Sequence, residues 1–291
     1  MILIVGASGQ LGGLIAHRLL DNAKAVRILV RSGSSYDALV TAGAEVVAGD
    51  LKDATSLRLA CRRIDAVITT ANATARGGED TIESVDLVGN RNLVDAAAAE
   101  EVGRFVFVSA LGASPEHPMP LLAAKGQTER RLRDSGMAWT VLQPNMFMDK
   151  LPMAVVGEPA LAGRPVTLVG EGRRRHSLVA MRDAAAYAVA ALEHPRAEGQ
   201  TLVFGGPQPV SWRDVVAAFE RELGRDLPVR TVPLGEPVPA LPDWLSGLLT
   251  ALETYDSPID SGALAATYGV TPTPLQDFVR GVVAASRRRA A

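Results

Sequence analysis

Short apolar runs alternate with longer helical patterns through the first half of the chain. Five runs, at residues 2–5, 25–30, 45–48, 66–69 and 105–108, are mostly apolar or β-branched and have the length of buried strands. Between them, apolar residues recur at helical spacing, as Leu11, Ile15 and Leu19 do after the first run. The alternation predicts an α/β protein with a doubly wound parallel sheet covered by helices on both faces.

The second half of the chain is less regular and richer in proline after Pro144. Short helical patterns remain legible, and one of them begins at Ser211, where the spacing to Asp214 matches a variant of the capping box. We therefore expect a sheet domain at residues 1–150 and a smaller lobe at residues 151–291.

The composition of the chain limits which partners and which cellular location we expect. The 291 residues are 47% hydrophobic, and the formal charge of −2 comes from 30 basic and 32 acidic residues. This balance favours neither a nucleic acid nor a membrane surface as partner.

The only cysteine, Cys61, shares a helix face with Leu57 and Ile64. We therefore expect a buried small side chain rather than a nucleophile, and no disulfide or Cys-based metal site. No apolar run approaches the roughly 18 residues of a membrane span, and we expect a cytoplasmic protein.

A glycine-rich turn is the strongest local signal. Gly6, Gly9 and Gly12 follow the first apolar run directly and open a helical pattern. Glycines allow a tight turn and close approach of a pyrophosphate, and the free N–H groups of a helix start favour an anion. The spacing is one residue wider than the usual dinucleotide fingerprint. The pattern predicts a dinucleotide site; the alternative is a glycine-rich turn that binds nothing.

The end of the second predicted strand indicates which dinucleotide is bound. NAD enzymes place an acidic residue there for the adenosine ribose, whereas this chain has Arg31 and Ser32 and no acid in residues 25–36. A guanidinium suits a 2′-phosphate in charge and in geometry. We therefore predict NADP(H) rather than NAD(H), the alternative being an ordinary surface arginine.

Taken together, these motifs resemble the short-chain dehydrogenase/reductase superfamily and, within it, the atypical NmrA-like branch that includes NADPH quinone reductases and triphenylmethane reductase. The resemblance covers nearly the whole chain. It is carried by VGASGQLGG at 5–13, GDLKDATSL at 49–57, TTANA at 69–73, FVFVSALGAS at 105–114, Lys125 with Glu129, and WTVLQPNMFMD at 139–149.

The resemblance implies a Rossmann-type fold and a set of cofactor contacts. Residues 166–193 would return to the large sheet, with a strand at 166–169 and a helix after Arg182, and the rest of the second half would bind the substrate. The cofactor-binding residues would be Gly6, Ser8, Gly9, Gln10 and Leu11 at the pyrophosphate, Arg31 and Ser32 at the 2′-phosphate, Asp50 and Leu51 at the adenine, Ala71, Asn72 and Ala73 along the cofactor, and Pro144, Asn145, Met146 and Phe147 at the nicotinamide.

Catalysis departs from the family pattern. Active members of the superfamily use a tyrosine four residues before the lysine, and Leu121 stands there before Lys125. The assisting serine falls near Ala110, with Ser109 adjacent. The resemblance implies that Lys125 holds the nicotinamide ribose and places a positive charge near the developing oxyanion; without the resemblance it could be a surface lysine.

Two histidines are candidate proton donors in place of the tyrosine. His117 lies in the loop after the fifth predicted strand, and His176 precedes Ser177. For each, an exposed or hydrogen-bonded histidine without a catalytic role is the alternative.

Loss of the tyrosine bears on the substrate class. A simple ketone yields an alkoxide with a basicity near that of hydroxide (pKa roughly 15.7), whereas a quinone yields a phenol-like oxyanion (pKa about 10), a difference of about 8 kcal/mol. We therefore expect an NADPH-dependent reductase of an aromatic carbonyl or quinone, acting as a monomer or homodimer. The alternatives are a non-catalytic NAD(P)-sensing binding protein and a structural subunit that keeps NADPH as a fixed ligand.

Overall fold

The computed structural model describes residues 1–73, 78–239 and 241–290. Within it the chain forms two compact units. The large unit consists of Met1–Pro144, Met181–Val203 and Thr267–Val270, and the small unit consists of Asn145–Ala180, Phe204–Ala266 and Thr271–Ala291. The chain thus returns to the large unit twice after first leaving it.

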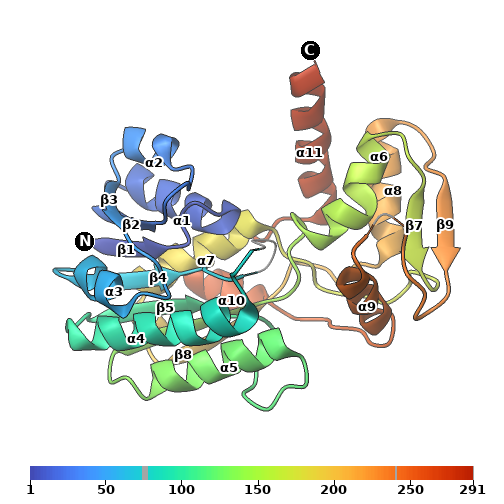
Figure 1. The fold of residues 1–291 in the computed structure, drawn as a ribbon. Coiled ribbons are helices and arrows are strands. Elements are labelled where there is room, and N and C mark those ends of the chain that lie inside the picture. Colours follow the sequence, from blue (N-terminus) through green and yellow to red (C-terminus); the bar gives the residue numbers. More distant parts are fainter. Residues whose placement is uncertain (74–77, 240, 291) are drawn as a thin grey trace. The chain divides into compact units, whose positions relative to one another are not determined.

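A seven-stranded sheet forms the centre of the large unit (Figure 1). Its strands are β1 (Ile2–Val5), β2 (Val26–Val30), β3 (Glu45–Ala48), β4 (Ala66–Thr69), β5 (Arg104–Val108), β6 (Ala138–Pro144) and β8 (Gln200–Phe204). They lie in the order β3-β2-β1-β4-β5-β6-β8, and every pairing from β3 to β6 is parallel. The predicted doubly wound α/β fold and its first five strands are confirmed.

Helices cover both faces of this sheet (Figure 1). On one face α1 (Gln10–Asp21) packs against α7 (Met181–Glu193), with α2 (Asp37–Thr41) beside α1. On the other face α3 (Ala54–Cys61), α4 (Asn90–Ala99) and α5 (Pro120–Arg133) lie side by side, and a π-helix, η1 (Ile82–Gly89), leads into α4. A short 3₁₀ turn, η3 (Pro195–Ala197), precedes β8. Because both faces are covered, the central strands β1 and β4 are largely buried on both sides.

The core of the large unit explains why the strand pattern is legible in the sequence. Leu3 and Val5 of β1 belong to the apolar cluster that also contains Leu57 and Cys61 of α3, while Ile4 is fully buried on the opposite face. Cys61 is fully buried, which confirms its expected place in the core. The rigid sheet holds the loops at the carboxyl ends of β1 and β4, where the strand order reverses and such sheets bind ligands.

The small unit has its own sheet and core. Its strands β7 (Val166–Val169) and β9 (Val229–Val232) pair in parallel. Its helices are η2 (Met153–Gly157, a π-helix), α6 (Glu158–Leu161), α8 (Trp212–Leu223), α9 (Asp243–Leu252) and α11 (Leu275–Ala290), while the residues of α10 (Gly262–Tyr268) are divided between the two units. The capping box predicted at Ser211 is present, because Ser211 Oγ accepts from the Asp214 amide and Asp214 Oδ2 accepts from the Ser211 amide.

One expectation about the second half is wrong. The strand at Val166–Val169 does not join the large sheet but pairs with β9, and its side chains enter the core of the small unit. The strand added to the large sheet is β8, which lies beside β6. Only the helix expected after Arg182 belongs to the large unit, as α7. A four-residue apolar strand carries no local information about its partner, so tertiary packing decides the pairing.

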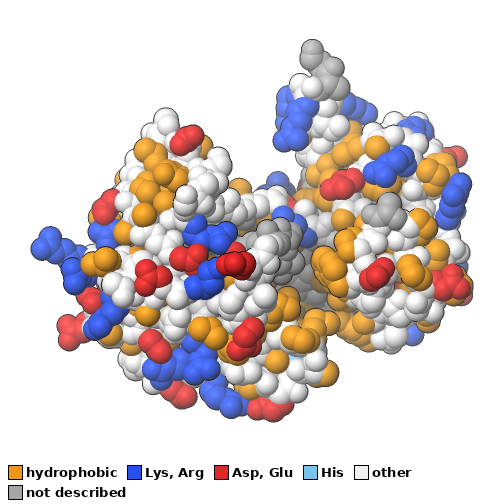
Figure 2. Space-filling model, viewed as in Figure 1, with side chains coloured by type: hydrophobic (Ala, Val, Ile, Leu, Met, Phe, Trp, Pro, Cys, Tyr) orange, Lys and Arg blue, Asp and Glu red, His pale blue; other side chains and the backbone are white. Residues whose placement is uncertain are grey.

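Charged side chains are distributed without a large area of one sign on the face shown in Figure 2, where basic and acidic residues are intermixed over the seven-stranded unit. Among residues 1–73, 78–239 and 241–290, every helix is too short or too polar to cross a bilayer.

Candidate functional site

The glycine-rich turn connects β1 to α1 as the sequence predicts. A Cβ built at Gly12 would lie 2.2 Å from the carbonyl oxygen of Gly6, so only glycine fits at this close approach of helix to turn. Gly9 is the N-cap of α1, none of the described side chains caps the helix, and its first turn contains no acidic residue. The turn therefore presents uncapped N–H groups and the positive end of a 12-residue helix, which suit an anionic group.

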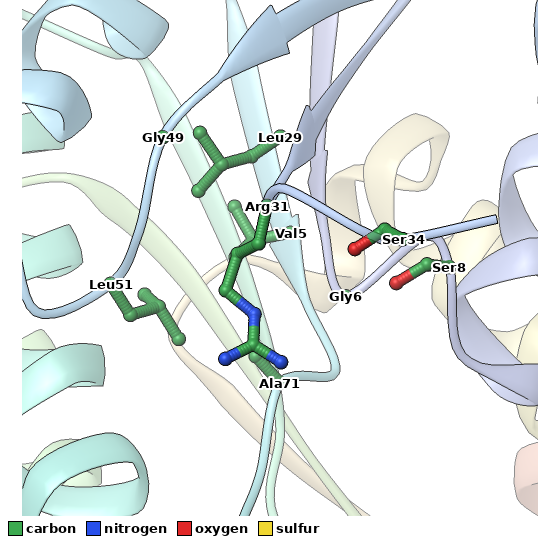
Figure 3. Close-up of a pocket in the computed structure, with 9 residues that line it drawn as sticks. All are labelled: Val5, Gly6, Ser8, Leu29, Arg31, Ser34, Gly49, Leu51 and Ala71. Carbon is green, nitrogen blue, oxygen red and sulfur yellow. The ribbon is translucent and has the colours of Figure 1, made fainter. Parts of the chain in front are cut away.

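A hollow opens beside this turn at the carboxyl ends of four strands (Figure 3). It is lined by residues that follow or end β1, β2, β3 and β4, namely Val5, Gly6, Ser8, Leu29, Arg31, Ser34, Gly49, Leu51 and Ala71. The side chain of Arg31 extends through the middle of this hollow, with Leu51 on one side and Ser8 and Ser34 on the other (Figure 3). The hollow thus combines apolar walls, a cation and a helix start.

Arg31 is held by an acidic residue that the sequence did not single out. Its Nη1 lies 2.6 Å from Asp80 Oδ2, and Lys52 Nζ lies 2.9 Å from Asp80 Oδ1. Hydrogen bonds from Lys52 and then from Arg31 lower the pKa of the Asp80 carboxyl to about 2, and the bond between Lys52 and Asp80 raises the pKa of Lys52. Two cations from different strand ends therefore share one carboxylate.

Buried polar groups fix the segment that follows β4. Asn90 donates from Nδ2 to the carbonyl oxygen of Ala71 at 3.2 Å, and the amide of Ala73 donates to Asp86 Oδ2 at 2.9 Å. Both Asn90 and Asp86 are buried, and Asp86 lies in the π-helix η1. Wider π-helical turns are frequent at functional sites. Here the π-helix η1 carries Asp86, whose carboxylate accepts from the Ala73 amide in the loop after β4.

A buried network links β5, α5 and β6. Ser109 Oγ donates to Glu129 Oε1 at 2.5 Å, Gln143 Nε2 donates to the same oxygen at 2.9 Å, and Arg133 Nη2 donates to Glu129 Oε2 at 2.8 Å. Glu129 is only 2% exposed. The hydroxyl hydrogen of Ser109 is thereby committed to Glu129, which leaves its oxygen available as an acceptor.

Lys125 lies one turn before Glu129 on α5 and is also buried. Its Nζ donates to the carbonyl oxygen of Val108 at 3.2 Å, the only hydrogen-bond acceptor it has among the described residues, and it lies 5.2 Å from the centre of the Phe107 ring. Burial lowers the pKa of the amine, while Asp86 and Glu129 raise it. An ammonium group has three N–H donors, so this one can still donate to a ligand at the carboxyl end of β5.

The loop after β5 packs closely against α5 beside Lys125. A Cβ at Gly126 would lie 2.2 Å from the carbonyl carbon of Ser114, so the loop rests directly on the helix next to Lys125. Leu121, four residues before Lys125, is half-buried in the first turn of the same helix.

Some of the predicted cofactor residues line the hollow and others do not. Five of them line the hollow, namely Gly6, Ser8, Arg31, Leu51 and Ala71. The start of α1 is formed by Gly9, Gln10 and Leu11. Two further residues hydrogen-bond locally: Asp50 Oδ1 accepts from the Lys52 amide at 2.8 Å, and Asn72 Nδ2 donates to the Thr70 carbonyl oxygen at 3.2 Å. Ser32 is exposed and does not line the hollow, where Ser34 lies instead.

The segment expected at the nicotinamide is divided between the units. Pro144 ends β6 in the large unit and accepts from the Leu111 amide at 3.0 Å, whereas Asn145, Met146 and Phe147 belong to the small unit. Asn145 Nδ2 donates to Ser257 Oγ at 3.1 Å, and Phe147 forms a bridge with Val179. Their role at a nicotinamide stays a prediction.

The two candidate histidines have local partners. His117 Nδ1 accepts from the Met119 amide at 3.0 Å and shares no hydrogen bond with Ser109 or Lys125 among the described residues. His176 is buried, with Nε2 3.1 Å from the carbonyl oxygen of Leu252 and Nδ1 2.7 Å from Ser257 Oγ. A carbonyl only accepts, so Nε2 carries the hydrogen and Nδ1 accepts from Ser257. Burial lowers the pKa of His176, which favours this neutral ring and not a proton donor.

Sequence reasoning missed Lys52, Asp80 and the role of Glu129. Lys52 had a usable signal, because it follows the third predicted strand and carboxyl ends of parallel strands converge. A buried acid one turn after Lys125 was a weaker signal for Glu129. Asp80 had none, because it lies 49 positions after Arg31 and no local pattern relates the two residues.

Known proteins resemble this chain in sequence and in fold. A model of the NAD(P)H-binding family matches residues 6–195. The chain is 33% identical over 233 residues to the NAD(P)H azoreductase of Xenophilus azovorans, covering 80% of this chain and 76% of that protein. It is 30% identical over 233 residues to a photosystem II assembly factor of Synechocystis sp., covering 80% and 71%. Its fold is similar to that of an NADPH-dependent quinone oxidoreductase from Escherichia coli solved with NADPH, with a TM-score of 0.80 and 22% identity over 97% of this chain and 100% of that one.

Proposed function

Because the chain belongs to the NAD(P)H-binding family, we propose that it is an NADPH-dependent reductase that transfers hydride to a carbonyl or quinone group of an aromatic or polycyclic small molecule. The observation that carries this proposal is the buried amine of Lys125 beside Ser109 at the carboxyl end of β5, with Leu121 in place of an acid. The family resemblance predicted from the sequence motifs is confirmed.

The residues of the large unit fit a dinucleotide. The turn at Gly6 and Gly12 leaves no room for side chains, and the uncapped start of α1 suits a pyrophosphate. The hollow between Leu51 and Ala71 has apolar walls for an adenine, and Arg31 reaches into it as a partner for a 2′-phosphate. The preference for NADPH over NADH follows from Arg31 and the lack of an acid in residues 25–36, at the end of β2.

The chemistry divides between cofactor and protein. When bound, the reduced nicotinamide supplies the hydride. Lys125 would donate hydrogen bonds to the nicotinamide ribose and stabilise negative charge near the acceptor, while Ser109, whose hydrogen is committed to Glu129, would accept one. Leu121 leaves the position of the usual tyrosine without an acid that a simple ketone requires. A delocalised acceptor requires it least, which favours quinones and conjugated aromatic carbonyls.

NADPH oxidation in the presence of quinones, aryl ketones and azo or triphenylmethane dyes tests the proposal, with NADH measured in parallel. We expect turnover with at least one conjugated acceptor and a loss of about 100-fold or more for Lys125→Met. Lys24→Gln is the matched control, because Lys24 is exposed and pairs with Glu193. NADPH binding without turnover of any acceptor would overturn the enzyme assignment.

A second candidate function is a dinucleotide-sensing binding protein. The observation in its favour is that one relative of 30% identity is an assembly factor, and the absent tyrosine is compatible with it. This candidate predicts NADPH binding, no turnover, and a change in association with a protein partner when NADPH is added. The acceptor panel therefore separates the two functions.

A further inference from the structure

The cluster of Arg31, Lys52 and Asp80 has a consequence for cofactor selection. We propose that Lys52 joins Arg31 in binding the 2′-phosphate of NADPH, and that Asp80 is an internal anion with which this phosphate competes. Asp80 would then limit how strongly the protein prefers NADPH to NADH. The inference rests on the proposed function, because it concerns the same nucleotide site.

The geometry places both cations around a single anion. Arg31 Nη1 lies 2.6 Å from one oxygen of Asp80 and Lys52 Nζ lies 2.9 Å from the other. The two cationic groups thus contact the two oxygens of one carboxylate. A phosphate presents oxygens at a similar spacing and forms the same kind of charge-assisted hydrogen bond, so one phosphate can contact both cations.

The charges and the exposure of this cluster favour an incoming anion. Two cations share the Asp80 carboxylate, whose side chain is only 6% exposed, while the side chains of Arg31 and Lys52 are 38% and 36% exposed. The two cations can therefore be reached from solvent, while the Asp80 carboxylate is covered. Asp50 and Glu79 also act on Lys52 through space, and these acids oppose a phosphate, so its binding depends on direct contact with the two cations.

The position of the cluster matches the nucleotide hollow. Arg31 crosses the hollow, and Leu51, the residue before Lys52, forms one of its walls (Figure 3). The guanidinium of Arg31 is anchored by Asp80. A nucleotide that enters must therefore contact the Arg31 side chain, and a 2′-phosphate offers it an alternative to Asp80.

Binding of two nucleotide fragments measured by calorimetry tests the inference without turnover. The probes are adenosine 2′,5′-bisphosphate and adenosine 5′-monophosphate, and the quantity compared is the ratio of their affinities. We expect Lys52→Gln to lower this ratio about fivefold, because it removes a cation that contacts the 2′-phosphate, and Asp80→Asn to raise it about fivefold, because it removes the anion that competes with the phosphate. The ratio is measured on the folded protein, so a change in stability alone does not alter it.

Two controls separate contact from general charge. Glu79→Gln removes an exposed acid that acts on Lys52 through space, and Lys24→Gln removes a lysine that pairs with Glu193 on α7; both should change the ratio by about twofold or less. An unchanged ratio in Lys52→Gln, or a lower ratio in Asp80→Asn, would overturn the inference. Failure of the wild-type protein to bind either fragment or NADPH would overturn the proposed function itself.

Discussion

Ser109 and Glu129 form a buried hydrogen bond of 2.5 Å between the end of β5 and the middle of α5, 20 positions apart in the chain. Glu129 accepts two further hydrogen bonds, from Gln143 and Arg133. This carboxylate therefore orients the serine beside Lys125 and joins two strand ends to the helix that carries the lysine.

Replacing Glu129 with glutamine should destabilise the fold. The substitution turns one acceptor oxygen into a donor that faces other donors in a buried site, and we expect a loss of about 2–4 kcal/mol in the free energy of unfolding. Urea denaturation measures it. Glu116→Gln is the control, because Glu116 pairs with Arg130 at an exposed position; an equal loss in both variants would contradict the importance of the buried network.

Lys125→Met should stabilise the protein at neutral pH even though we expect it to lower turnover. Burial lowers the pKa of Lys125 from 10.5, so the unfolded chain binds more protons than the folded one between the two pKa values, and stability rises with pH there. The destabilisation caused by burying the charged Lys125 is fully present when the pH is below the pKa of Lys125 in the folded protein, and it disappears when the pH is above about 10.5. We expect the variant to gain about 1–3 kcal/mol at pH 7.

Urea unfolding of both proteins at pH 7 and pH 10 checks this pH dependence. The advantage of Lys125→Met should shrink as the pH rises. An advantage that grows with pH, or a variant less stable than the wild type at pH 7, would show that the buried ammonium is net stabilising.

Arg31→Gln should reduce the affinity for NADPH relative to NADH. Loss of the guanidinium removes a charge-assisted partner of the 2′-phosphate, and we expect the ratio of the two affinities to fall about tenfold. Fluorescence titration of each cofactor measures it. Arg58→Gln is the control at an exposed position on α3, and a ratio that is the same in both variants would remove Arg31 from the phosphate site.

Gly12→Ala should prevent dinucleotide binding or destabilise the large unit. The added Cβ would lie 2.2 Å from the Gly6 carbonyl oxygen, so either the turn or α1 must move. Gly281→Ala is the matched control, because its Cβ meets nothing within 4 Å on α11 among the described residues, and it should stabilise by about 0.5–1 kcal/mol. Thermal unfolding and NADPH titration compare the two. Normal stability together with normal NADPH binding in Gly12→Ala would contradict the close packing of α1 on the turn.

Cys61 should be inert in the folded protein. Burial raises the pKa of its thiol to about 12, so the reactive thiolate is scarce and inaccessible. We expect a thiol reagent at pH 8 to label it at least about 1,000-fold more slowly in the native protein than in urea. Labelling at equal rates would show that the thiol is not buried in the core on which α3 packs.

The sequence by itself determined the class of fold and the most local part of the site. Strand and helix periodicity, and the requirement for glycine at a crowded turn, are local properties, so β1 to β5, the turn at Gly6 and Gly12 and the cation at the end of β2 were predictable. Lys125 was found through its motif, and the core position of Cys61 through helical spacing.

Only the tertiary structure decided the partners. It paired β7 with β9 instead of the large sheet, committed the Ser109 hydrogen to Glu129, and brought Asp80 to Arg31 and Lys52. The physical reason is common to all three. Hydrogen bonds and ion pairs act over a few ångströms in space, and which groups come within that reach depends on how distant segments pack, which local periodicity does not encode.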